Sequence, residues 1–204
     1  MRYLALGDSY TIGEGIAEED RWPHQLVRML RLQGVDIEDP LFIARTAWTT
    51  DELSDAIDAE HLREKFDLVT LLIGVNDQYR SRPVTSFASE FESLLRRAKG
   101  FARRNASRLI ALSIPDWGAT PFAEGRDRVL IAGEIDAYNA RARELTEAAG
   151  ARWVDITEAT RQMQHVPSLA APDGLHPSAE MYRQWAKLLV PVALSVLTRK
   201  AKAT

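Results

Sequence analysis

Phe66-Asp67-Leu68-Val69-Thr70-Leu71-Leu72-Ile73-Gly74 is the stretch that decides the fold. Residues 66–73 are almost continuously apolar, and a glycine closes the run. A strand covered on both faces has this pattern, whereas a strand with one face in water alternates apolar and polar residues. We therefore predict a central parallel strand over residues 66–73, with other structure packed on both sides of it.

Strand-like and helix-like patterns alternate along the rest of the chain. Shorter apolar runs predict strands at 2–6, 40–44, 108–114 and 152–156. Helical spacing predicts helices at 21–33, 50–59, 83–104 and 126–149, and a terminal helix capped by Ser178; Thr50 or Asp51 is expected to cap the helix at 50–59. This alternation produces a parallel sheet wrapped by helices. The predicted fold class is α/β: residues 1–204 form a single three-layer α/β/α sandwich with a five-stranded, mostly parallel, flavodoxin-like sheet.

The overall composition argues against several classes of protein. A net charge of −3 gives no electrostatic basis for binding nucleic acid, and the lack of cysteine rules out disulfides, Cys-ligated zinc and thiol nucleophiles. The longest apolar runs, 68–75 and 188–197, are too short to span a bilayer, so we expect no integral membrane contact. The first strand begins almost at Met1, without a signal-peptide pattern before it. We expect a cytoplasmic protein, or a secreted one whose signal peptide has been removed.

A serine follows the first predicted strand directly. The apolar run from Tyr3 to Leu6 ends in Gly7-Asp8-Ser9. In an open α/β sheet, ligands bind beyond the carboxyl ends of the strands. Ser9 is therefore a candidate nucleophile, provided that the chain also supplies a base for it.

An aspartate and a histidine lie three residues apart near the other end of the chain, in Pro172-Asp173-Gly174-Leu175-His176-Pro177. This spacing lets a carboxylate meet one imidazole nitrogen and leaves the other nitrogen free for a hydroxyl. A serine needs such a base, and the base needs a third group that fixes its tautomer. Asp-x-x-His alone is common, and a turn-stabilising role would then be favoured. In combination with Gly7-Asp8-Ser9, the pattern favours catalysis.

A third polar segment, Gly74-Val75-Asn76-Asp77, follows the central strand. Acyl transfer builds negative charge on the former carbonyl oxygen, and one fixed donor contributes roughly 3–4 kcal/mol to its stabilisation. The Asn76 amide is such a donor at a strand's carboxyl end. The structural alternative is an ordinary turn residue after a glycine.

These three segments together resemble the sequence blocks of the GDSL/SGNH hydrolases, in the family's order and over essentially the whole chain. The resemblance implies Ser9 as nucleophile, His176 as base and Asp173 as the acid that orients it. It further implies an oxyanion hole made by the Ser9 backbone N–H, the Asn76 side chain and one more backbone N–H. No cofactor and no metal are expected.

The sequence departs from the family pattern at the third oxyanion donor. The family usually has a glycine after the second strand, whereas this chain has Arg45-Thr46-Ala47-Trp48-Thr49-Thr50, with Ala47 at the glycine position. Backbone N–H donation survives an added methyl group. The two open questions are whether the loop needs a positive φ, which favours glycine, and whether the methyl leaves room for substrate.

Residues that flank the motifs are candidates for the substrate pocket: Asp8, Tyr10, Trp48, Gln78 and Trp117, with Tyr79 and Arg80 considered beside them. A local packing role is the alternative for each. No serine lies in a Gly-x-Ser-x-Gly elbow, and Gly13-Glu14-Gly15 lacks the third glycine of a dinucleotide-binding loop. His24, His61 and His165 have no metal-ligand spacing.

The expected function is that of a serine ester hydrolase acting on small or short-chain esters, with acetylated carbohydrates among the candidates. A lysophospholipase or thioesterase of the same fold is one alternative. A non-catalytic flavodoxin-like binding domain with a vestigial triad is another, favoured only by the missing glycine. The expected partner is a small-molecule ester, and the sequence leaves the oligomeric state open.

Overall fold

Five parallel strands form the sheet, in the order β2-β1-β3-β4-β5. The computed structural model describes residues 1–198 and places the strands at Tyr3–Gly7 (β1), Leu41–Ala44 (β2), Leu68–Leu72 (β3), Leu109–Leu112 (β4) and Arg152–Val154 (β5). This order is that of a flavodoxin-like sheet. The predicted fold class is confirmed, and β3 lies at the centre with every residue buried, as its apolar run indicates.

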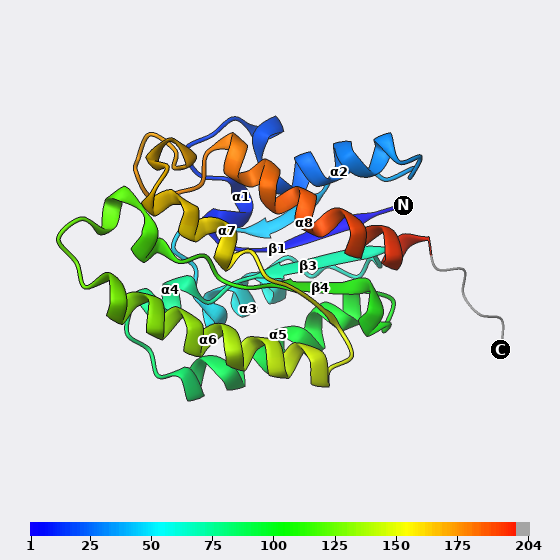
Figure 1. Cartoon of the computed structure of the whole chain (residues 1–204). Helices are drawn as coiled ribbons and strands as arrows, with labels where there is room; N and C mark the ends of the chain where they lie inside the picture. Colours follow the sequence, from blue (N-terminus) through cyan, green and yellow to red (C-terminus); the bar gives the residue numbers. More distant parts are fainter. Residues whose placement is uncertain (199–204) are drawn as a thin grey trace.

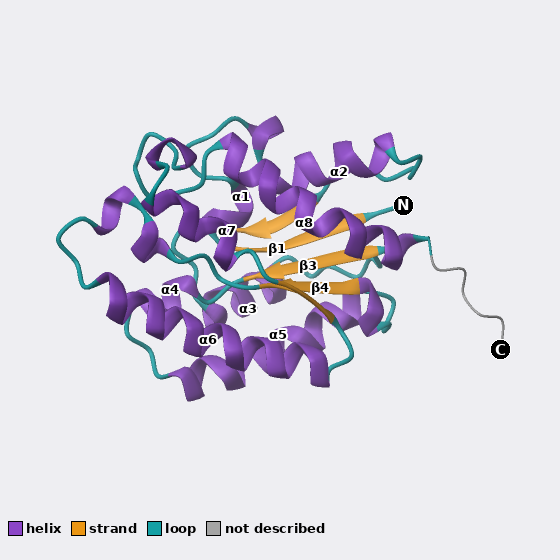
Figure 2. Ribbon diagram, in the orientation of Figure 1, coloured by secondary structure: helices purple, strands orange, loops and turns teal. Residues whose placement is uncertain are grey.

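Helices cover both faces of the sheet (Figure 1). They span Ser9–Ile12 (α1), Trp22–Leu32 (α2), Thr50–Ala59 (α3), Val75–Tyr79 (α4), Val84–Phe101 (α5), Arg128–Ala148 (α6), Thr157–Arg161 (α7) and Ala179–Leu197 (α8). Helices α2 and α8 pack together over one face, while α3, α5 and α6 cover the other (Figure 2). Trp22 and Trp185 are fully buried on the α2/α8 side. Within residues 1–198, no helix combines the length and the apolar character needed to cross a membrane.

The strand order reverses direction at β1. The chain moves from β1 outward to β2, and then returns past β1 to pair β3 on its other side. Connections that leave in opposite directions open a crevice at the carboxyl ends of the strands, and ligands bind there in sheets of this kind. The segments that follow β1, β2 and β3 are those that carry Ser9, Ala47 and Asn76.

The structure corrects the sequence prediction at short elements. Helices α1, α4 and α7 were not predicted, because four or five residues are too few to show a helical period. Asn76, expected at the carboxyl end of the central strand with a turn as the structural alternative, lies in the first turn of α4. The cap of α3 is Thr49 rather than Thr50 or Asp51: the Thr49 N–H donates to Glu52 Oε2 at 2.9 Å, and both side chains form a capping box.

Candidate active site

Ser9 is the first residue of α1, at the carboxyl end of β1. Asp8 caps this short helix, and its Oδ1 accepts a hydrogen bond from the Tyr10 N–H at 3.0 Å. Gly7 is required immediately before the cap, because a Cβ there would lie 2.1 Å from Thr11 Oγ1. Local contacts within residues 7–13 shape the turn that presents Ser9, and the Trp22 indole N–H, which donates to the Tyr10 carbonyl oxygen at 3.1 Å, ties it to α2.

The structure brings Ser9, His176 and Asp173 together in one line. His176 Nε2 lies 3.0 Å from Ser9 Oγ, and His176 Nδ1 lies 2.6 Å from Asp173 Oδ2. The other carboxylate oxygen, Asp173 Oδ1, accepts the backbone N–H groups of Leu175 and His176 at 2.9 and 3.0 Å. These contacts fix the carboxylate, and an ionised carboxylate selects the tautomer that carries its proton on Nδ1. His176 Nε2 is then free to accept the Ser9 proton.

The charge state of Asp173 suits this arrangement. Burial acts to raise the pKa of its carboxyl group, but the hydrogen bonds from His176 and from the Leu175 N–H outweigh burial and lower that pKa below its ordinary value. Asp173 is therefore ionised at neutral pH. The His176 ring is itself buried and packs against Tyr10, with ring centroids 5.0 Å apart. This packing restricts the imidazole to the orientation that meets both partners.

Asn76 reaches the same place from the start of α4. Gly74 caps this helix with a φ of 122°, and a Cβ on it would lie 2.5 Å from the Phe87 ring. The Asn76 Nδ2 atom donates one hydrogen bond to the Trp48 carbonyl oxygen at 3.0 Å. That bond assigns the nitrogen side of the amide and leaves the second N–H of Nδ2 for another acceptor.

We call residues 46–49 the Ala47 loop. Their backbone shows whether position 47, where the family has a glycine, needs a positive φ. Ala47 has a φ of +66°, so it adopts the left-handed conformation that glycine ordinarily supplies. The methyl group therefore does not change the loop's backbone, but it makes that backbone conformation less favourable. Within residues 1–198, no protein group accepts a hydrogen bond from the Ala47 N–H.

Side chains from other segments hold residues 46–48 of the Ala47 loop, and the capping box with Glu52 holds Thr49. Thr46 Oγ1 donates to the Glu14 carboxylate. Arg80 Nη2 donates to the Ala47 carbonyl oxygen at 2.7 Å, and Asn76 holds the Trp48 carbonyl. Glu52, which accepts the Thr49 N–H, also lies 3.4 Å from Arg80 Nη1. Tertiary contacts thus support the strained alanine.

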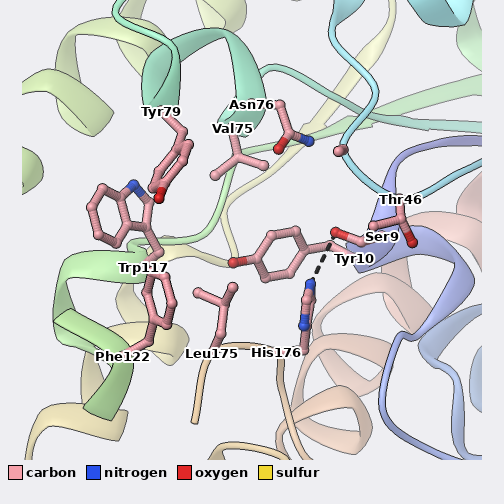
Figure 3. Close-up of a pocket in the computed structure, with 11 residues that line it drawn as sticks. Ser9, Tyr10, Thr46, Val75, Asn76, Tyr79, Trp117, Phe122, Leu175 and His176 are labelled. Carbon is pink, nitrogen blue, oxygen red and sulfur yellow. Dashed lines mark hydrogen bonds between the residues drawn. The ribbon is translucent and has the colours of Figure 1, made fainter. Parts of the chain in front are cut away.

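A cleft of about 210 Å³ opens beside Ser9 and His176 (Figure 3). Its lining is largely apolar and aromatic, and consists of Ser9, Tyr10, Thr46, Ala47, Val75, Asn76, Tyr79, Trp117, Phe122, Leu175 and His176. All three predicted oxyanion donors and two of the predicted pocket residues, Tyr10 and Trp117, are in this wall. Sequence reasoning missed Phe122 and Leu175; their only signal was their position in loops beyond the strands' carboxyl ends.

Three predicted pocket residues do not line the cleft, and the structure gives a reason for each. Asp8 points into the interior as a helix cap, and Trp48 packs against the core while only its carbonyl meets Asn76. Gln78 lies behind the wall: its Oε1 accepts the Trp117 indole N–H at 2.7 Å, and its Nε2 donates to Glu134 at 2.6 Å. Gln78 therefore orients a pocket residue without being one.

The Asp8 carboxyl group has an unusual environment. Its Oδ2 atom is buried and lacks a hydrogen-bond partner among residues 1–198. Burial is the main cause that raises the pKa of Asp8 to about 8, with a smaller contribution from the Asp77 charge. Asp8 is thus largely protonated at neutral pH, directly beside the serine of the site.

One acidic cluster has the spacing of a metal site, but a guanidinium already lies within it. Asp51, Asp77 and Glu90 could each offer an oxygen to one ion. Arg82 Nη1 lies 2.7, 3.3 and 3.5 Å from their carboxylates. Asp77 also accepts the Thr50 N–H at 3.1 Å, and so supports the start of α3. The cluster is therefore a structural ion-pair network that joins α3 to the segment after α4.

The fold and these side chains define a hydrolase of the α/β sandwich type. The family model of the GDSL-like lipase/acylhydrolase family matches residues 5–184. The chain belongs to this family. A search of curated proteins found no match.

Solved structures share the fold over nearly their full length. They include the lipase/acylhydrolase from Enterococcus faecalis, with 22% identity, a TM-score of 0.75 and coverage of 98% of this chain and 100% of that one. The acetylxylan esterase Axe2 from Geobacillus stearothermophilus has 17% identity, a TM-score of 0.71 and coverage of 98% and 94%. The psychrotrophic esterase EstA from Pseudoalteromonas sp. has 16% identity, a TM-score of 0.73 and coverage of 97% and 99%. At these identities the likeness concerns the fold.

Proposed function

We propose that this protein is a carboxylic ester hydrolase that forms an acyl-enzyme on Ser9. The observation that carries the proposal is the continuous contact from Ser9 Oγ to His176 Nε2 and from His176 Nδ1 to Asp173. A serine hydroxyl becomes a competent nucleophile when a base of fixed tautomer accepts its proton.

In the proposed first step, Ser9 Oγ bonds to the ester carbonyl carbon while His176 Nε2 takes the Ser9 proton. The carbonyl π electrons move onto the oxygen, which the backbone N–H groups of Ser9 and Ala47 and the Asn76 amide stabilise. The bond to the alcohol oxygen then breaks, and the alcohol leaves with the proton from His176. Asp173 stabilises the imidazolium while it exists.

The second step repeats this chemistry with water. Water attacks the acyl carbon and gives a proton to His176 Nε2; the bond to Ser9 Oγ then breaks, and Ser9 recovers its proton. The carboxylic acid product leaves. Ester and water are the reactants, and each catalytic group in this cycle belongs to the chain itself. Each step conserves protons.

The cleft supports a short alkyl or aryl ester as the substrate. Its volume of about 210 Å³ is below the range of roughly 300–1,000 Å³ that is usual for drug-sized ligands. Its walls are mostly apolar, so an acetylated carbohydrate would find few partners for its hydroxyl groups apart from Thr46, Asn76 and the phenol groups of Tyr10 and Tyr79. A lysophospholipid would need a longer channel.

Hydrolysis of p-nitrophenyl acetate, butyrate and octanoate tests the proposal. We expect turnover of the first two esters, a lower kcat/KM for octanoate, and loss of activity in Ser9→Ala. Ser86→Ala, an exposed serine in the first turn of α5, is the matched control and should keep full activity. Full activity in Ser9→Ala would end the proposal, and failure of all three esters in the folded wild type would favour a non-catalytic binding domain.

A further inference from the structure

The end of the cleft away from Ser9 is built from three aromatic rings. Figure 3 shows Tyr79, Trp117 and Phe122 together on that side, with Val75, Tyr10 and Leu175 between them and the Ser9–His176 pair. Trp117 meets Tyr79 edge-on at 5.2 Å and Phe122 at 6.2 Å between ring centroids. Because Gln78 also holds the Trp117 indole N–H, this aromatic end has a fixed shape.

An arginine lies over all three rings. The Arg126 guanidinium carbon is 5.9 Å from the Tyr79 centroid and 5.5 Å from those of Trp117 and Phe122. Arg126 lies in the turn between the 3-10 helix Pro121–Ala123 and α6, one residue after Gly125, whose φ is 75°. A cation is attracted to aromatic faces at such distances, so the rings hold the guanidinium against the aromatic end of the cleft, next to the residues that line it.

The Arg126 charge has no carboxylate partner within residues 1–198. Many of the arginines form ion pairs, among them Arg80, Arg82, Arg97 and Arg161, whereas no acidic oxygen lies within 4.0 Å of Arg126. The neighbouring Asp127 uses its Oδ1 to accept the Leu130 N–H as the cap of α6. Among residues 1–198 the Arg126 side chain donates no hydrogen bond to a protein acceptor, so its N–H donors are available to a ligand.

We infer that Arg126 makes the aromatic end of the cleft a binding site for a carboxylate carried by the substrate. This inference rests on the proposed ester hydrolysis at Ser9. The substrate class is an ester whose acyl chain is apolar in the middle and ends in a carboxylate, that is, a hemiester of a short dicarboxylic acid. Its chain lies along Val75 and Leu175, and its terminal carboxylate accepts hydrogen bonds from Arg126. A planar guanidinium matches a carboxylate in this way.

The test compares charged and neutral esters of equal length. The substrates are p-nitrophenyl hemiesters of glutaric and adipic acid, each paired with the methyl-terminated ester of the same chain length. We expect wild type to prefer the hemiester, and Arg126→Gln to lower kcat/KM for the hemiester about tenfold while changing the neutral ester less than about twofold. Raising the salt concentration to about 1 M should weaken the wild-type preference, because Arg126 is exposed.

Arg63→Gln is the matched control, since it removes the same charge from an exposed arginine before β3, at the amino-end edge of the sheet. It should leave the preference unchanged. A p-nitrophenyl ester with a sulfonate on the alcohol ring reports whether the charge is recognised on the alcohol side; a preference confined to that ester would overturn the acyl-side assignment.

Equal ratios of hemiester to neutral ester in wild type and Arg126→Gln would overturn the inference. Faster hydrolysis of the neutral esters by Arg126→Gln would also overturn it, because Arg126 would then block the cleft. Both outcomes leave Ser9-dependent hydrolysis of neutral esters intact. Failure of the proposed function is distinct, because no ester of either kind would then be hydrolysed.

Discussion

The turn that presents Ser9 and the Ala47 loop follow neighbouring strands, β1 and β2, yet they are held in different ways. The Ser9 turn relies mostly on its own residues, with Gly7 for space, Asp8 as a cap and Gly13 at a φ of 66°; one tertiary hydrogen bond, from the Trp22 indole to the Tyr10 carbonyl oxygen, adds to them. The Ala47 loop has an alanine at the left-handed position and depends on Arg80 and Asn76 from elsewhere, besides the local capping box of Thr49 with Glu52. Local sequence therefore contributes most to positioning the nucleophile, and tertiary contacts contribute most to positioning the loop beside it.

This difference predicts where the site is vulnerable. Substitutions of Ser9 and its catalytic partners should abolish or nearly abolish ester hydrolysis. Substitutions around the Ala47 loop should reduce the rate by misplacing a donor, and the size of the loss should depend on the residue at position 47.

The largest effect is expected from Asp173→Asn. The amide cannot select the Nδ1–H tautomer of His176, so kcat should fall by roughly 10⁴-fold. Steady-state hydrolysis of p-nitrophenyl butyrate measures this loss. Asp36→Asn is the control: Asp36 is exposed and far from Asp173 in the sequence, so this variant should match wild type. A loss smaller than about tenfold would contradict the role given to Asp173 in orienting His176.

Asn76→Ala should lower kcat by roughly 10²–10³-fold while KM changes little, because the amide acts on charge that develops only in the transition state. The same assay separates kcat from KM. Asn105→Ala provides the control: this exposed asparagine caps the short helix before β4, at the opposite edge of the sheet. A rise in KM at constant kcat would instead indicate that Asn76 binds the ground state.

Asp8→Asn tests the Ser9 turn through the pH dependence of stability. The folded-state pKa of about 8 lies above the ordinary aspartate pKa of 3.8, so between these values the folded protein keeps a proton that the unfolded chain has lost. The contribution of Asp8 to the free energy of unfolding therefore falls as pH rises from about 4 to about 8. Asparagine retains the capping oxygen and does not titrate.

Urea unfolding across that pH range should show wild type losing stability relative to Asp8→Asn, by an amount on the order of several kcal/mol. Parallel curves for the two proteins would contradict a raised pKa at Asp8.

Arg80→Met should reduce kcat by roughly tenfold, because the Ala47 carbonyl loses its partner and the left-handed alanine relaxes. Arg97→Met is a matched control: Arg97 also donates to a backbone carbonyl of this region, that of Ser54 at 3.0 Å, but it does so away from the cleft. In an Ala47→Gly background the loss should shrink, since glycine adopts a positive φ readily. An equal loss in both backgrounds would contradict the role given to Arg80.

Ala47→Gly alone should have the smallest effect, a gain of up to about 1 kcal/mol in the free energy of unfolding, because it removes the cost of a left-handed alanine. Ala137→Gly, at an exposed position inside α6, should instead lose about 1 kcal/mol. Thermal or urea unfolding compares the two. A destabilised Ala47→Gly would show that the loop does not strain its alanine.

The contrast between local contacts at the Ser9 turn and tertiary contacts at the Ala47 loop also explains which parts of the site could be predicted from the sequence. Gly7-Asp8-Ser9 and Asp173-x-x-His176 are local patterns, and the structure joins them as expected because the ends of β1 and of the loop before α8 meet at one edge. The partners of the Ala47 loop were not predictable, since Arg80 and Ala47 are 33 residues apart and share no pattern. The prediction that Trp48 lines the pocket was wrong for the same reason. Its position beside Ala47 suggested the cleft, but its side chain packs against the core.

The central claim is that Ser9 is the nucleophile, and covalent labelling tests it most directly. A fluorophosphonate should add one equivalent to the folded protein, and peptide mapping by mass spectrometry should place the adduct on Ser9. Asp173→Asn should label far more slowly, in proportion to its loss of esterase activity. An adduct on another residue, or no adduct in a preparation that hydrolyses p-nitrophenyl butyrate, would contradict the account.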